Sequence, residues 1–138
     1  MKAEELMIGD WVFGIYPNGK YTPPVCIAAV DIYPNNKSSR IVAYSGYGYQ
    51  QEDLAPIPLT AEILEKNGFG YYSIGGAEQW LIKDDYYDIE VYEWSDSIWV
   101  FRYESTEMNT PHEQRTMSYL HQLQHAFKDC GIDKEITI

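Results

Sequence analysis

Two histidines near the end of the chain have the spacing that could support metal chemistry. His121 and His125 stand four positions apart, so both side chains would project from one face of a helix and could share a metal ion. A zinc site needs a third ligand, and the nearest candidates are His112 and Glu113. The HExxH pattern of metalloproteases places Glu directly after the first His, whereas this chain has Gln122 there.

The helix that would carry these histidines is expected over residues 113–129. Its apolar stripe includes Leu123 and Phe127, which we expect to face the core. His121 and His125 lie about 150° from the middle of that stripe, so they should point toward solvent or the flank of the sheet, and not into a pocket. We therefore predict a non-catalytic protein with no metal and no other cofactor. A metal-binding or hydrolytic protein that uses His112, His121 and His125 is the alternative.

Acidic and aromatic side chains offer two further possibilities. A run of five carboxylates could hold a hard cation or act as general acid and base, but it lacks the glycine-punctuated pattern of a calcium loop. Strand alternation would also split the run between two faces, so we interpret it as a solvated sheet edge. Trp80, Trp94 and Trp99 could form a sugar-stacking platform, although we expect Trp99 to lie in the core. The five carboxylates are Asp84, Asp85, Asp88, Glu90 and Glu93.

A loop of alternating tyrosine and glycine is the preferred binding site. Residues 44–51 place Tyr44, Tyr47 and Tyr49 on a pliable backbone, a composition typical of adaptable binding surfaces. The competing interpretation is a strand edge whose tyrosines cover the sheet. We predict a cytoplasmic binding module that recognises a protein or peptide through these three tyrosines.

The elements that position these residues point to an α+β fold. In the first half, an Asn18-Gly19 hairpin turn follows a first strand, and further strands are expected at 25–33, 40–45 and 47–51. This spacing predicts a small SH3-like β-barrel half. In the second half, strands at 68–73, 77–83, 86–94 and 97–104 and a final strand at 135–138 predict an antiparallel sheet packed against one long C-terminal helix.

A short helix separates the two halves. Pro56 and Pro58 favour extended backbone, Thr60 is placed as an N-cap, and Gly68 is placed as the left-handed residue that ends the helix. We predict one compact domain over residues 1–138, with possible halves at 1–59 and 60–138.

Composition restricts the kinds of partner. The chain has 138 residues and a net charge of −11, which opposes binding to nucleic-acid phosphates and to anionic membranes. No stretch has the length of a membrane-spanning helix, and no signal peptide is expected. Cys26 and Cys130 lack metal spacing, so we interpret them as reduced residues of a cytoplasmic protein.

Three segments of the chain resemble a group of short uncharacterised bacterial and mobile-element proteins. They are the N-terminal Ile8-Gly9-Asp10-Trp11-Val12, the central Pro56-Ile57-Pro58-Leu59-Thr60 with Ile63-Leu64-Glu65-Lys66-Asn67-Gly68-Phe69, and the C-terminal Tyr119-Leu120-His121-Gln122-Leu123-Gln124-His125-Ala126. The resemblance implies no particular activity. It adds one alternative, an acidic accessory protein of a mobile element that inhibits a host factor.

Overall fold

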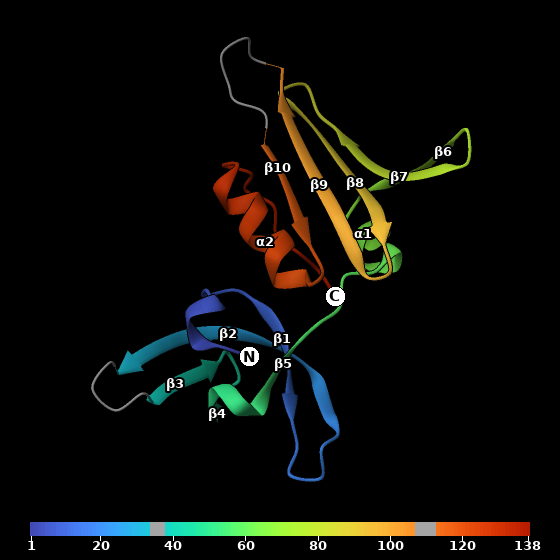
Figure 1. Ribbon diagram of the computed structural model, residues 1–138. Coiled ribbons are helices and arrows are strands. Elements are labelled where there is room, and N and C mark those ends of the chain that lie inside the picture. The colour runs from blue at the N-terminus through green and yellow to red at the C-terminus, as the bar shows by residue number, and fades with distance from the viewer. Residues whose placement is uncertain (34–37, 107–112) are drawn as a thin grey trace. The chain divides into compact units, whose positions relative to one another are not determined.

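The computed structural model describes residues 1–33, 38–106 and 113–138 of the chain. It divides into two compact units, Met1–Ile57 (unit 1) and Pro58–Ile138 (unit 2), each built on a five-stranded antiparallel sheet (Figure 1). The predicted α+β class is confirmed, because a C-terminal helix accompanies the two sheets. In the described ranges, no helix has the length and apolar character needed to cross a lipid bilayer.

Unit 1 is a sheet organised around one long strand. Its strands are β1 (Trp11–Ile15), β2 (Tyr21–Tyr33), β3 (Ser38–Ala43), β4 (Gly48–Tyr49) and β5 (Leu54–Pro56), and its short 3₁₀ helices are η1 (Ala3–Glu5) and η2 (Gln51–Asp53). The strand order is β4-β3-β2-β1-β5. The first part of β2 pairs with β1 and the second part pairs with β3. Val12, Ile27, Ile41 and Leu54 are fully or almost fully buried and form the centre of the core.

The hairpin predicted at Asn18-Gly19 is confirmed, since Gly19 has φ of 78° and joins β1 to β2. The second strand begins earlier than expected, however, at Tyr21, and it runs through Pro23 and Pro24. Proline has no N–H to donate to a ladder. The backbone N–H of Gly14 instead donates to the hydroxyl oxygen of Thr22 at 2.9 Å, so a side chain supplies a bond in this irregular stretch.

The SH3-like barrel is not established by the described strands, which form no closed barrel. β4 and β5 are the two ends of the strand order, and no pairing joins them among the described residues.

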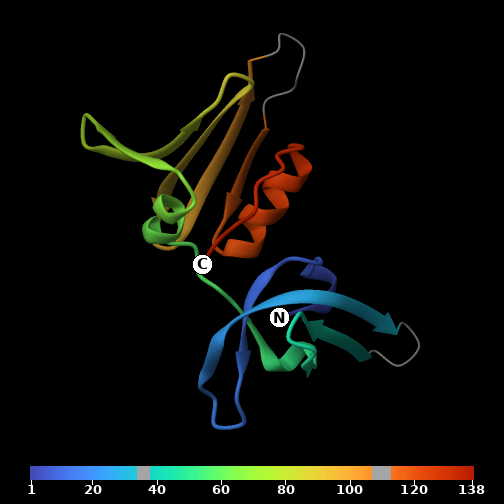
Figure 2. The same cartoon turned by 180° about the vertical axis from the view of Figure 1, so that it is seen from behind.

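Unit 2 is a sheet with a helix across one face. Its elements are α1 (Ala61–Lys66), β6 (Gly70–Ile74), β7 (Ala77–Lys83), β8 (Tyr87–Ser95), β9 (Ile98–Ser105), β10 (Glu113–Met117) and α2 (Leu120–Asp129), and the strand order is β10-β9-β8-β7-β6. Figures 1 and 2 show α2 lying along β9 and β10. The Phe127 ring of α2 lies 6.2 Å from the rings of Phe101 and Phe69, and Leu123 is fully buried, so the predicted core-facing stripe is confirmed.

The short helix α1 has the ends that the sequence predicts. The Thr60 hydroxyl accepts the N–H of Ile63 at 3.3 Å, which caps the first turn. At the other end Gly68 has φ of 87°, and the Phe69 N–H donates to the carbonyl of Leu64 at 3.1 Å. This last bond closes the helix as a Schellman motif does.

The long helix predicted over residues 113–129 is wrong in its first part. Residues Glu113–Met117 form strand β10, and α2 begins only at Leu120. β10 pairs with β9 through five successive residues, from Glu113 opposite Tyr103 to Met117 opposite Trp99. These sheet hydrogen bonds and the burial of Met117 outweigh a local helical preference, because propensity is a weak prior against tertiary contacts.

The final strand predicted at 135–138 is also wrong, because none of these residues belongs to a strand. A side chain holds the segment in place instead. Asn67 accepts the N–H of Thr137 at 2.7 Å and donates to the Thr137 carbonyl at 2.7 Å. Asn67 is itself buried, so its amide replaces the missing strand pairing.

Candidate functional site

A groove of about 910 Å³ on unit 1 is the candidate site. The end of β1, the start of β2, the β3–β4 turn and η2 contribute its walls. Its volume lies in the range of about 300–1,000 Å³ that ligand sites occupy. The lining residues are Ile15, Tyr16, Pro17, Gly19, Thr22, Pro23, Pro24, Val25, Ser45, Tyr47, Gly48, Tyr49 and Asp53.

Gly14 makes room for one wall of this groove. A Cβ atom at Gly14 would lie 2.8 Å from Cε1 of Tyr49 and 2.9 Å from Cγ2 of Thr22. Both distances are shorter than carbon atoms tolerate without movement. The Thr22 hydroxyl is held in turn, since it accepts from Gly14 and donates to the Pro23 carbonyl at 2.6 Å. The absence of a side chain at position 14 therefore lets the Tyr49 ring lie against the first hairpin.

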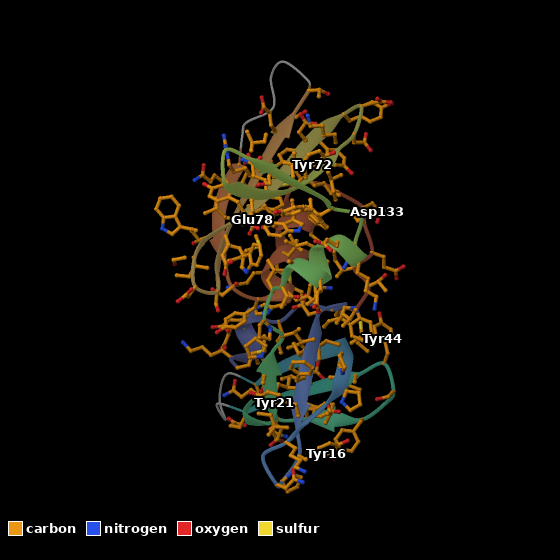
Figure 3. The ribbon with its side chains drawn as sticks, turned by 90° about the vertical axis from the view of Figure 1, so that its right-hand side faces the viewer. Tyr16, Tyr21, Tyr44, Tyr72, Glu78 and Asp133 are labelled. Atoms are coloured by element: carbon orange, nitrogen blue, oxygen red, sulfur yellow. The ribbon has the colours of Figure 1, made fainter. Side chains whose placement is uncertain are left out.

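The tyrosines of the groove form a group. The rings of Tyr47 and Tyr49 are 4.8 Å apart and inclined at 58°. Burial, followed by the nearby phenols of Tyr47 and Tyr16, raises the pKa of Tyr49 above its usual value. Tyr16 and Tyr47 are largely exposed, and Figure 3 shows Tyr16 near the end of the first hairpin.

Asp53 is the one charged side chain among the lining residues, all of which belong to the described part of the chain. It is exposed at the end of η2, and its carboxylate accepts the N–H of Gln50 at 3.4 Å. The lining contains neither histidine nor cysteine, and Asp53 supplies its one carboxylate. The groove presents aromatic and proline rings, phenol and aliphatic hydroxyls, and this carboxylate.

The three tyrosines predicted from the sequence are placed differently. Tyr47 and Tyr49 line the groove, whereas Tyr44 is 68% exposed and lies outside the lining. That these tyrosines bind a partner stays a prediction. Tyr16, the two prolines of β2 and Asp53 were not among the predicted site residues. The adjacent prolines beside Tyr21 were the available signal, although residues that cannot donate to a ladder mark an irregular strand edge and not a binding site.

His121 does not point into solvent, one of the two placements expected for it, since only 4% of its surface is exposed. It lies in the first turn of α2, where its ring stacks on Tyr119 at 5.9 Å and meets the His125 ring edge-on at 5.6 Å. Because the helix begins at Leu120, the residue before it has extended backbone and its ring covers His121. This placement corrects the expectation from helical spacing.

The histidines are not brought together with further metal ligands in the described ranges. There, no group of three or more His, Cys, Asp or Glu side chains could hold a metal ion. His112, the third candidate ligand, lies outside the described residues.

The three tryptophans do not form one platform. Trp80 and Trp99 are buried in unit 2 with their rings 5.3 Å apart and edge to face, so Trp99 lies in the core as predicted. The Trp80 indole donates to a carboxylate oxygen of Glu65 at 3.1 Å. Trp94 is 72% exposed at the end of β8.

Comparison with known proteins identifies no family for the chain. No family model, no curated protein and no solved structure matches it.

Proposed function

We propose that this protein is a non-catalytic binding module that holds a segment of a protein partner in the tyrosine-lined groove of unit 1. The observation that supports it is the convergence of Tyr16, Tyr47 and Tyr49 on one groove. Tyrosine rings supply large contact area at a low entropic cost and keep a hydroxyl for hydrogen bonding. The groove offers no set of catalytic groups beside them.

An extended peptide suits this groove better than a compact small molecule. The groove follows the first hairpin from Ile15 at the end of β1 to the consecutive residues Thr22–Val25 of β2, so one side of it is a stretch of extended backbone. Proline rings and tyrosine faces are apolar, and they can pack against the side chains of an extended chain. Asp53 provides a charged acceptor at one point of the lining.

We also propose that unit 1 is an open relative of the SH3-like barrel. Three features support this relation: β2 serves both β1 and β3, β5 returns to pair with β1, and the 3₁₀ helix η2 directly precedes β5. The order of the elements along the chain supports this relation to the SH3-like barrel. The proposed binding groove does not require a closed barrel.

Selection from a displayed peptide library would test the binding proposal. The library is enriched on the wild-type chain, and the affinities of selected peptides are then measured for Tyr47→Ser and Tyr49→Ser. We expect each substitution to weaken binding about tenfold, because truncation of a central aromatic contact typically costs 1–2 kcal/mol or more.

The matched control is Tyr44→Ser, which removes an exposed tyrosine of the same loop outside the groove lining. Its affinities should stay within about twofold of the wild type. Selected peptides that bind Tyr47→Ser and Tyr49→Ser as tightly as the wild type would show that the groove is not the site.

The acidic accessory role has its own support in the distribution of charge. Unit 1 has 4 basic and 6 acidic residues, whereas unit 2 has 6 basic and 15 acidic residues. A surface of this kind attracts basic proteins over the distance of a Debye length. Capture of basic host proteins by this chain that weakens as the salt concentration rises would support this role. Capture that does not depend on the salt concentration would count against it.

A further inference from the structure

The sheet of unit 2 splits at one end. β7 pairs with β8 only from Trp80, opposite Val91, to Lys83, opposite Asp88. Residues Ala77–Gln79 of β7 pair with β6 alone, and the end of β8 beyond Val91 pairs with β9 alone. Figures 1 and 2 show the β6–β7 ribbon bending away from the rest of the sheet. Two neighbouring strands therefore present backbone edges without a ladder partner in the described residues.

A hollow of about 590 Å³ lies at this split. Most of its lining comes from the two diverging segments, residues 76–79 on the ribbon and 92–96 at the end of β8. Glu90 and Arg102 complete the lining. Open strand edges are the places where an extended segment from another chain can add its own backbone hydrogen bonds.

The end of β8 is shaped to expose an aromatic side chain beside the split. The register between β8 and β9 shifts between Glu93 and Ser95, which leaves Trp94 at a bulge. A bulge redirects the side chain it carries. Trp94 is the most exposed of the large apolar residues in the described chain, and Tyr92 lies beside it in the hollow. Such rings can pack on aliphatic stems and on cations.

The charge of the lining selects the partner. The hollow has four carboxylates, from Glu78, Glu90, Glu93 and Asp96, and one cation, from Arg102. Arg102 is already paired with Glu90 at 3.1 Å. The other carboxylates have no ion pair with a basic side chain in the described ranges.

We propose that this split binds a short extended peptide segment rich in lysine or arginine. The segment pairs its backbone with the open edge of β7 at Ala77–Gln79 and sets its cations among the three carboxylates that lack ion pairs and the Trp94 ring. A second copy of this chain suits the site poorly, since unit 2 has 15 acidic and 6 basic residues and two such surfaces repel each other.

The test uses the full chain and a short peptide that alternates lysine with threonine, with binding measured by calorimetry. We expect saturable binding. The double variant Glu78→Gln/Glu93→Gln should bind about fivefold more weakly, because two exposed ion pairs with the peptide are lost. Figure 3 shows Glu78 on the ribbon and Asp133 elsewhere on unit 2. The double variant Asp133→Asn/Glu135→Gln removes the same charge outside the hollow and should stay within about twofold of wild type.

Two further measurements separate strand pairing from general attraction. The same peptide with methylated backbone nitrogens should bind about tenfold more weakly, because it cannot donate to a strand edge. In the wild-type complex, amide exchange at Ala77–Gln79 should slow, and this readout does not require any substitution to fold.

The proposal is overturned if the lysine peptide does not bind, if both double variants weaken it equally, or if the methylated peptide binds as tightly. It is also overturned if Tyr47→Ser abolishes binding, because the peptide would then occupy the groove of unit 1. Failure here leaves the function proposed for unit 1 intact, since the two sites share no residue.

Discussion

Both units are five-stranded antiparallel sheets, yet their cores are built from different side chains. In unit 2, Trp80, Trp99, Phe101 and Phe127 are buried, and the Phe127 ring of α2 packs on Phe101 of the sheet. Unit 1 has only short 3₁₀ helices in its described residues, and its core consists mainly of aliphatic side chains. Three of its tyrosines, Tyr16, Tyr47 and Tyr49, line a groove instead. Packing beneath the helix thus accounts for buried aromatic residues of unit 2, whereas Trp94, at the end of β8, stays exposed.

The largest effect should come from removing the aromatic side chain that joins α2 to its sheet. Phe127→Ala should cost about 3–5 kcal/mol of the free energy of unfolding, because the ring is buried against Phe69 and Phe101. Urea denaturation measures the loss. The exposed neighbour provides the control, and Lys128→Ala should change stability by no more than about 0.5 kcal/mol.

The same experiment tests whether the two units are independent. We expect amide exchange to show that Phe127→Ala loosens unit 2 and leaves the core of unit 1 protected. Equal loss of protection at Val12 and Ile41 would show that the two units unfold as one.

Gly14→Ala should damage the groove of unit 1. The added methyl group would lie 2.8 Å from the Tyr49 ring, so the ring or the strand must move, at a cost of about 1–3 kcal/mol. Nuclear magnetic resonance shifts of Tyr49 and denaturation midpoints would record the change. Tyr44→Ser is the control, because it changes an exposed side chain outside the groove lining. Unchanged Tyr49 shifts in Gly14→Ala would contradict the close packing of this ring against position 14.

Asn67→Ala should release the C-terminal segment of unit 2. It removes both bonds to Thr137 and the bond to the Ile63 carbonyl, and buried groups left without partners cost about 1–3 kcal/mol. Faster proteolysis after Ile132 would show the release. Asn67→Asp keeps an acceptor for the Thr137 N–H but turns a buried carboxylate oxygen toward the Ile63 and Thr137 carbonyls, so at neutral pH its effect should be at least as large as that of Asn67→Ala. A segment equally resistant to protease in all three proteins would show that other contacts hold it.

The smallest expected effect is at the N-cap of α1, near the boundary between the units. Thr60→Ala removes the acceptor for the Ile63 N–H and should cost about 1 kcal/mol. Thr60→Ser keeps a hydroxyl and should restore most of this stability, as thermal denaturation can measure. Equal melting temperatures for the alanine and serine variants would mean that the cap contributes nothing.

The candidate groove was only half predictable from the sequence. Tyr47 and Tyr49 were selected because alternating tyrosine and glycine is a local pattern. Asp53 and the prolines of β2 reach the groove only because β2 pairs with β1 and η2 precedes β5. No local sequence pattern predicts that these residues lie together, since they come from separate parts of the chain.

The sequence alone determined the features that depend on backbone geometry over a few residues. Thr60 and Gly68 delimit α1, and Asn18-Gly19 makes the first hairpin, because capping bonds and positive φ angles act within one turn. Only the tertiary structure decided that residues 113–117 pair with β9 as a strand and that His121 is buried. In those stretches the local preference for helix or strand is weak. The free energy gained from hydrogen bonds and apolar burial against distant elements therefore exceeds the difference in free energy between the two local conformations.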